Sequence, residues 1–115
     1  MSGFPNLFMI VGPNTGLGHN SMVFMIESQL RYVLDALARM DRERIAAVDA
    51  KPQVAQAFND RLQQRMKRTV WSTGGCTSWY QTRSGLITTL WPGTSLEYRL
   101  RTRRFRLADY EPLRA

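Results

Sequence analysis

The sequence predicts an α/β fold: part of a sheet with flanking helices, followed by a short hairpin and a basic C-terminal helix. Three segments support this prediction. The unbroken apolar run Leu7 to Val11 is typical of a strand covered on both faces. From Ser21 to about Met40, apolar residues recur every three or four positions, which is helical spacing. The apolar run Ile45 to Val48 predicts a second buried strand, so the three segments together indicate a βαβ unit.

The first predicted helix has a wide apolar stripe, which we expect to pack on the core. Its positions are Met22, Ile26, Leu30, Val33 and Leu37, widened by Val23 and Leu34. A second helix is predicted from Pro52 toward Thr69, because proline suits a first helical turn and Val54, Phe58, Leu62 and Met66 are spaced by four.

The last third of the chain has a different character. Two short segments, CTSWYQT and LITTLW, flank the turn sequence Arg83-Ser84-Gly85 and predict two strands joined as a hairpin. Thr94 and Glu97 have capping-box spacing and predict the start of a basic helix, LEYRLRTRRF. We expect the end, Leu107 to Ala115, to be a tail without regular structure.

Size and charge limit the possible classes of protein. A chain of 115 residues with 43% hydrophobic content supports one modest core. The net charge of +7 favours an anionic partner, whether nucleic acid, a membrane surface or a phosphate-bearing cofactor. Cys76 is the single cysteine, and no run of about 20 apolar residues predicts a membrane span, so we expect a reducing cytoplasm.

The glycine-rich segment between the first strand and the helix is the main candidate site. Its glycines allow close approach of the backbone to a ligand. Asn20 or Ser21 can cap the helix, whose N-terminal N–H groups and positive dipole end favour a polar, electron-rich group. Apart from His19, the first charged side chain is Glu27, so this site would select by shape and hydrogen bonds.

The segment Gly16 to Ser21 departs from the dinucleotide-binding pattern GxGxxG. Ser21 replaces the third glycine, four residues separate the strand from Gly16, and Asp49 falls later than the roughly 20-residue offset of a ribose-binding acid. It is not a P-loop either, because no Gly-Lys pair follows. Taken alone, the segment could be a strand-to-helix turn whose glycines relieve backbone strain.

Two long runs resemble one enzyme family. GFPNLFMIVGPNTGLGHNSMVFMIESQLRYV, from Gly3 to Val33, is similar to the closing strand, loop and helix of the FAD domain in flavin-dependent monooxygenases of the Baeyer–Villiger and flavin-containing monooxygenase type. The run from Cys76 to Phe105 resembles the C-terminal segment of the same enzymes. The GxGxxG motifs by which the family binds FAD and NADPH are absent from this chain. The resemblance therefore implies the C-terminal part of such an enzyme.

That resemblance also implies how the chain is organised. Residues 1–115 would form a single incomplete domain containing part of the FAD-domain sheet. Within it, 1–49 would supply the closing strand, loop, helix and next strand, 50–70 a helix, and 71–115 the hairpin, basic helix and tail.

The resemblance assigns roles to nine residues. The flavin would contact the helix N-terminus at Asn20, Ser21 and Met22, while Gly12 and Pro13 shape the exit from the strand. Trp79 would lie near NADP, and the substrate pocket would be bordered by Leu17, Gly18 and His19. Met22 could equally be a core methionine, and Trp79 could equally belong to the hairpin core. No catalytic residue and no metal ligand is assigned.

The implied activity is flavin reduction by NADPH followed by transfer of one oxygen atom from O2 to a ketone or to a nitrogen- or sulfur-containing substrate. The isolated chain is expected to be inactive, because its partner, the missing N-terminal FAD- and NADP-binding part, supplies most of the cofactor contacts.

Two other classes stay open. A basic nucleic-acid-binding module could use the basic helix, with Arg99, Arg101, Arg103, Arg104 and Arg106 on phosphates. Nucleic acid is not the expected partner, because these arginines spread around the helix instead of forming one stripe. A self-associating structural module, forming a homo-oligomer, could pair through the edge of the strand Leu7 to Val11.

Overall fold

The computed structural model describes residues 1–16, 21–68, 82–83, 86 and 89–114. Its helices are α1 (Met22–Glu43), α2 (Pro52–Met66) and α4 (Ser95–Arg101), followed by the 3-10 turn η1 (Leu107–Asp109). Two strands, β1 (Ile45–Ala50) and β2 (Tyr110–Arg114), form an antiparallel sheet. The prediction of mixed helices and strands is therefore confirmed.

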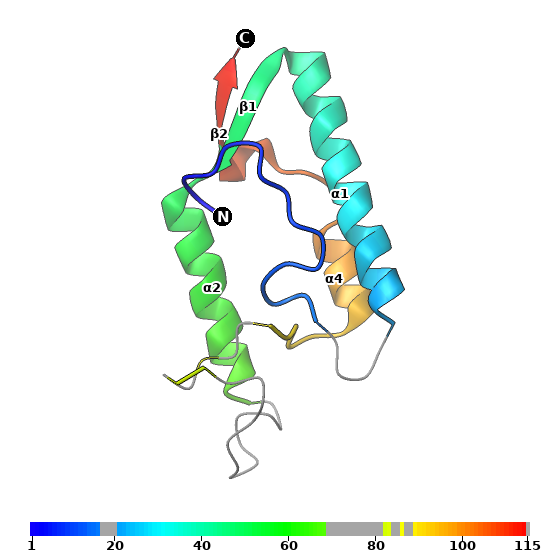
Figure 1. Ribbon diagram of the computed structural model, residues 1–115, viewed down its shortest axis with the longest axis vertical. Coiled ribbons are helices and arrows are strands. Elements are labelled where there is room, and N and C mark those ends of the chain that lie inside the picture. The colour runs from blue at the N-terminus through cyan, green and yellow to red at the C-terminus, as the bar shows by residue number, and fades with distance from the viewer. Residues whose placement is uncertain (17–20, 69–81, 84–85, 87–88, 115) are drawn as a thin grey trace.

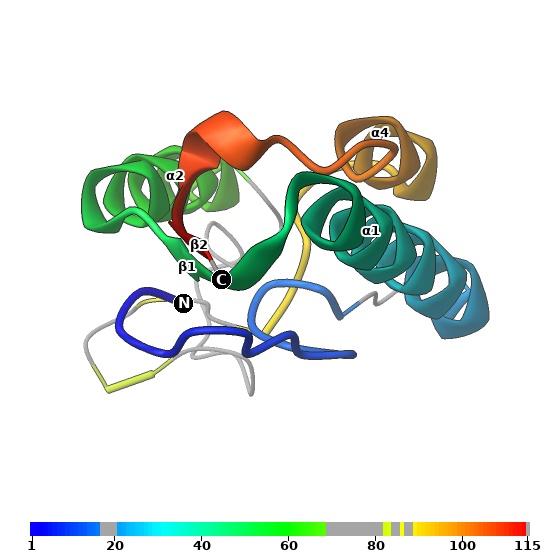
Figure 2. The same cartoon turned by 90° about the horizontal axis from the view of Figure 1, so that it is seen from above.

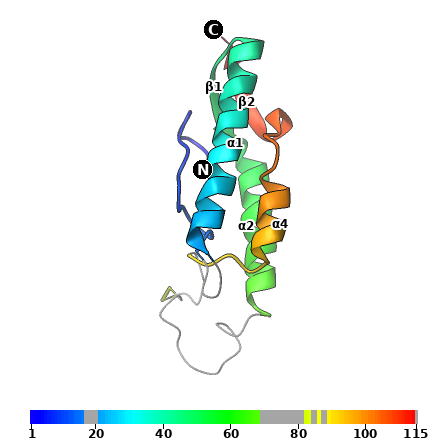
Figure 3. The same cartoon turned by 90° about the vertical axis from the view of Figure 1, so that its right-hand side faces the viewer.

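The two long helices run along the long axis of the molecule, and the small sheet joins them at one end (Figure 1). Seen from above, β1 and β2 lie between α1 and α2 (Figure 2). The N-terminal segment and α4 lie on opposite sides of α1, in this view and from the side (Figures 2 and 3). Helix α1 is thus covered from two directions.

Helix α1 confirms the helical spacing but buries a different face from the one predicted. Its buried residues are Met25, Ser28, Gln29, Ala36 and Met40. By contrast, Leu30 is 47% exposed, Leu34 64% and Leu37 50%. The predicted core-facing stripe is wrong for this chain, because the elements that pack on α1 approach from the other side. The helix ends where Arg44 adopts left-handed backbone angles, with φ 53° and ψ 48°.

The sheet differs from the predicted βαβ unit. Strand β1 is the second predicted strand, but it pairs antiparallel with β2, Ala50 opposite Tyr110 and Val48 opposite Pro112. Pro112 is tolerated because a two-stranded sheet has only edge strands. The C-terminal segment predicted to be an irregular tail therefore supplies a strand, since the backbone groups of β1 require a hydrogen-bonding partner.

The segment Leu7 to Val11, predicted to be a buried strand, is neither a strand nor buried in this chain. Met9 is 42% exposed and Val11 52%. Its attachment to β1 runs through Asn6, whose N–H donates to the Val48 carbonyl over 3.0 Å and whose Oδ1 accepts from the Val48 N–H over 3.0 Å. No described strand pairs with this segment, so its apolar run lacks the two covered faces that the prediction assumed.

Helix α2 confirms the predicted second helix, with Pro52 in its first turn. Helix α4 starts as predicted, because the Thr94 hydroxyl accepts a hydrogen bond from the Glu97 N–H at 3.0 Å. However, α4 ends at Arg101 and β2 follows it, so the basic C-terminal helix is not confirmed in the predicted form. The predicted hairpin falls largely outside the described residues.

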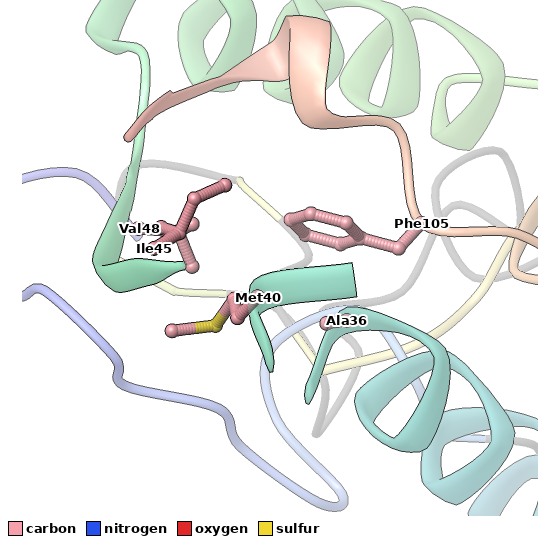
Figure 4. Close-up of a cluster of buried hydrophobic side chains, with 5 residues drawn as sticks. All are labelled: Ala36, Met40, Ile45, Val48 and Phe105. Carbon is pink, nitrogen blue, oxygen red and sulfur yellow. The ribbon is translucent and has the colours of Figure 1, made fainter. Parts of the chain in front are cut away.

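The buried side chains form small separate clusters. The first joins α1, β1 and the segment before η1 through Ala36, Met40, Ile45, Val48 and Phe105 (Figure 4). The Phe105 ring, 4% exposed, also contacts Tyr32 edge-on, with ring centroids 5.5 Å apart. A second cluster joins all three helices through Met25, Leu62, Trp91 and Tyr98. The first cluster therefore packs on the C-terminal half of α1, and the second packs on its N-terminal half.

Candidate functional site

The described part of the glycine-rich segment, residues 12 to 16, is a tightly bonded turn. The Thr15 hydroxyl donates to the Gly12 carbonyl at 2.6 Å, and Asn14 adopts a positive φ of 55°. Asparagine tolerates this conformation better than most residues. The Asn14 side chain, which is 7% exposed, donates to the Leu90 carbonyl at 2.9 Å. The turn is therefore anchored to a segment that lies far away in the sequence.

Gly16 adds two backbone hydrogen bonds between the turn and the same distant segment. Its N–H donates to the Thr89 carbonyl at 2.8 Å, and its carbonyl accepts from the Trp91 N–H at 2.9 Å. A Cβ at this position would lie 2.8 Å from the Thr89 carbonyl oxygen, so no larger residue fits without moving the backbone. This glycine is required for close packing of two chain segments, which is a structural reason for at least one glycine of the turn.

Gly12 and Pro13 line an open groove of about 240 Å³ between the N-terminal segment and α1. The remaining lining residues are Met1, Leu7, Phe8, Met9, Thr15, Gln29, Tyr32, Val33, Tyr98, Thr102 and Tyr110. None of the described side chains in this lining is charged, so they would recognise a ligand by apolar contact and neutral hydrogen bonds.

Three tyrosines, Tyr32, Tyr98 and Tyr110, contribute hydroxyl groups to the lining of the groove. The hydroxyls of Tyr32 and Tyr110 lie 2.8 Å apart and share a hydrogen bond. Burial raises the pKa of both phenols, and of Tyr98, above the ordinary value of 10.0. All three hydroxyls therefore stay neutral at physiological pH.

The N-terminus of α1 is the second part of the candidate site. Ser21 occupies the N-cap position, as predicted, but its side chain makes no capping hydrogen bond. The first turn also contains no acidic residue. Ser21 is exposed and Met22 is half-buried. The N–H groups of this turn thus have no capping partner from the Ser21 side chain.

The remaining predicted site residues cannot be placed. Leu17, Gly18, His19, Asn20 and Trp79 lie outside the described residues, as does Cys76. The structure brings Gly12 and Pro13 together on the groove, while Ser21 and Met22 begin the helix beyond it.

Sequence reasoning did not identify Asn14, Thr15 and Gln29. The Gln29 side chain, 6% exposed, accepts a hydrogen bond from the Val11 N–H at 2.8 Å and so ties the N-terminal segment to α1. One signal was present: Ser28 and Gln29 are polar residues within an apolar helix pattern, and buried polar side chains normally have hydrogen-bond partners. The spacing of residues along the sequence does not indicate which groups Ser28 and Gln29 bind.

A second open cavity, of about 290 Å³, lies between α2 and α4. It is lined by Phe58, Leu62, Gln64 and the arginines Arg61, Arg65, Arg68 and Arg101. Arg65 binds the Glu97 carboxylate through two nitrogens, at 2.6 and 2.9 Å, and Arg101 lies 3.2 Å from the same carboxylate. This pairing lowers the pKa of Glu97 and raises that of Arg65. The ion pair therefore connects two helices.

Metal binding and membrane insertion find no support in the described residues. They contain no group of three or more His, Cys, Asp or Glu side chains arranged to hold a metal ion. None of the helices found there is long and apolar enough to cross a bilayer.

Comparison with known proteins shows which enzymes contain a similar segment. The chain is 54% identical over 114 residues to a Baeyer–Villiger monooxygenase of Streptomyces coelicolor, and 53% identical over 110 residues to one of Pseudomonas aeruginosa. These matches cover 98% and 95% of the chain. The sequence is that of a flavin monooxygenase segment. An FAD-binding monooxygenase of Aspergillus niger is 36% identical over 110 residues.

Solved structures give the same fold for this monooxygenase segment. An oxidized steroid monooxygenase bound to NADP matches all of the chain with a TM-score of 0.81 and 21% identity. Cyclohexanone monooxygenase from Rhodococcus sp. Phi1, bound to NADP+, matches 99% of it with a TM-score of 0.75 and 22% identity. No protein-family model matches the chain.

The segment is short beside these enzymes. It spans 22% and 21% of the two bacterial relatives and 22% of each solved chain.

Proposed function

We propose that the chain is the C-terminal part of an FAD- and NADPH-dependent monooxygenase of the Baeyer–Villiger type, and that it supplies one side of the flavin pocket. The observation that carries this proposal is the 54% identity over nearly the whole chain to a Baeyer–Villiger monooxygenase. The matching steroid and cyclohexanone monooxygenases are bound to NADP or NADP+, which supports the second cofactor. On this proposal, residues 1–115 are a single incomplete domain.

The start of α1 fits a flavin. Its first turn carries neither a Ser21 capping bond nor an acidic side chain, so its N–H groups and positive dipole end favour an electron-rich ring edge. Asn20, Ser21 and Met22 would present these groups, and Gly12 and Pro13 would direct the chain toward them. FAD, when bound, supplies the activation of O2, and the residues of this chain orient the ring and exclude water.

The other roles concern positions outside the described residues. Leu17, Gly18 and His19 would border the substrate, and Trp79 would stack on or hydrogen-bond to NADP. The relatives named Baeyer–Villiger monooxygenases favour a ketone as substrate over a nitrogen or sulfur compound.

We infer that the chain by itself neither retains FAD nor catalyses. It lacks both GxGxxG motifs, whose turns and helix N-termini bind cofactor diphosphates. A purified sample should therefore be colourless and should not oxidise NADPH when a cyclic ketone is added. A yellow sample with ketone-dependent NADPH oxidation would contradict this inference.

The proposal is tested by transplantation. In the Streptomyces coelicolor relative, the matching 114-residue segment would be replaced by this chain, and FAD content and ketone-dependent NADPH oxidation would be measured. We expect a yellow, active chimera. The control is the same relative without its segment, which should lose both properties. A chimera that folds but has no flavin and no activity would contradict the proposal.

The basic residues do not favour nucleic acid as a second candidate. Arg99 pairs with Glu27 at 3.4 Å, Arg101 with Glu97 at 3.2 Å and Arg106 with Asp109 at 3.8 Å. Internal pairing leaves fewer cations for phosphates.

A further inference from the structure

Helix α1 leaves several large apolar side chains uncovered on its outer side. Its outward residues include Val23 at 63% exposure, Leu30 at 47%, Leu34 at 64% and Leu37 at 50%. The buried side, in contrast, contains the polar residues Ser28 and Gln29 beside Met25, Ala36 and Met40. On an amphipathic helix, large aliphatic side chains normally face the core.

These four outward residues, here called the α1 stripe, form one continuous surface. At about 100° per residue they fall within an arc of about 60°, and at about 1.5 Å per residue they extend over about 21 Å. None of the four is charged. The arc runs past Ile26 and Val33 toward the groove, so the stripe continues an apolar surface that the chain leaves half-covered.

Within the part of the chain that the structure describes, the neighbours of α1 leave the stripe free. On one flank, Glu27 pairs with Arg99, the Phe24 ring lies 3.9 Å from the Arg99 guanidinium carbon, and the Asp35 carboxylate accepts from the Phe105 N–H. On another flank, Gln29 binds the N-terminal segment through Val11. Figure 2 shows these two flanks as opposite sides of α1, with no drawn helix or strand beyond its outer side.

A second apolar segment is exposed as well. Leu7, Met9, Ile10 and Val11 are 41–52% exposed, although their sequence is typical of a strand covered on both faces. Exposed apolar surface of this extent generally marks a surface that another part of a protein covers.

We propose that the α1 stripe is the surface on which the remaining part of the parent monooxygenase packs. This inference rests on the proposed function. The relatives are about five times as long as the chain, since the chain covers 22% of the first, so they contain the chain length needed to cover the stripe. The occupant is an apolar, uncharged face of that part. A second copy is disfavoured, because two chains of net charge +7 repel each other.

The experiment compares one double variant in two settings. Leu34→Gln with Leu37→Gln removes apolar surface while keeping good helix formers. The matched control, Arg31→Gln with Ala38→Gln, alters two exposed positions of the same helix that lie outside the stripe. Both are placed in the isolated chain and in the chimera that carries this chain within the Streptomyces coelicolor relative.

We expect the stripe variant to lower the melting temperature of the chimera by roughly 5 °C relative to the control, with loss of retained FAD, because it buries polar amides. In the isolated chain the two variants should melt within about 1 °C of each other. Equal effects of both variants in the chimera would overturn the proposal. An equal drop in melting temperature in the isolated chain and in the chimera would also overturn it, because the stripe would then belong to the chain's own core.

Three further outcomes are decisive. If the unaltered chimera binds no flavin, the proposed function fails and this inference fails with it. If that chimera is yellow and active but tolerates the stripe variant, only the packing surface is wrong. An isolated chain that is dimeric by light scattering, and that becomes monomeric in the stripe variant while the chimera is unaffected, would assign the stripe to a second copy instead.

Discussion

Glu97 performs two tasks within a single turn of helix. Its N–H is capped by the Thr94 hydroxyl, which the Thr94 to Glu97 spacing predicts. Its carboxylate turns outward instead and holds Arg65 of α2 in a two-point ion pair. The capping hydrogen bond can be predicted from the sequence because Thr94 and Glu97 lie within four consecutive residues. The ion pair depends on Arg65, which lies 32 positions away and which no spacing rule identifies.

The Arg65 to Glu97 pair should make stability depend on acidity. Because pairing lowers the pKa of Glu97 below its ordinary value of 4.5, the folded chain binds this proton less readily than the unfolded chain. The stabilisation that this ion pair provides is therefore fully present above the ordinary pKa of Glu97. It is lost as the pH falls through the lowered pKa of the folded chain. Glu97→Gln should remove this part of the acid sensitivity and reduce stability at pH 7, by at most about 1 kcal/mol since the pair is partly exposed.

Denaturant unfolding of both proteins at pH 7 and pH 3 measures this effect. The exposed Glu111→Gln serves as the control and should reproduce the wild-type pH dependence. An unchanged difference between the two pH values in Glu97→Gln would exclude the pair as its source.

At the scale of elements, the C-terminal strand and the segment before it pack the end of the chain against α1 and β1. Strand β2 pairs with β1, and the segment before it inserts Phe105 among residues of α1 and β1 (Figure 4). The Phe105 and Tyr110 rings also lie 4.6 Å apart between centroids. One aromatic side chain thus joins the first and last elements of the fold.

Phe105→Ala should accordingly destabilise the chain by about 3 to 5 kcal/mol, because it removes a large buried ring and leaves a cavity. Thermal unfolding followed by circular dichroism tests this, with Leu100→Ala, at an exposed site, as the control. A loss no larger than that of the control would mean that the cluster around Phe105 contributes little to stability.

At the scale of the whole molecule, the core is divided among small clusters of five, four and two buried residues. The radius of gyration is 15.4 Å, larger than the roughly 13 Å typical of a compact chain of this length. Much apolar surface remains outside these clusters. The chain is thus less compact than an independent domain of its size.

The isolated chain should therefore bind the dye anilinonaphthalene sulfonate while keeping the near-ultraviolet circular dichroism of a fixed Trp91. The Leu34→Gln, Leu37→Gln variant should reduce the dye fluorescence, and the Arg31→Gln, Ala38→Gln control should not. Equal fluorescence in all three proteins would show that the dye binds elsewhere.

The sequence by itself determined the local structure of this protein and its family. Spacing and capping predict α1, α2 and the start of α4, because those elements depend on side chains within a few residues of each other. The runs Gly3 to Val33 and Cys76 to Phe105 were sufficient to indicate a flavin monooxygenase.

Only the tertiary structure decided which surfaces are covered. It pairs β1 with β2, pairs no described strand with Leu7 to Val11, and buries Ser28 and Gln29 of α1. The physical reason is that burial and strand pairing depend on which partners are present in the same chain.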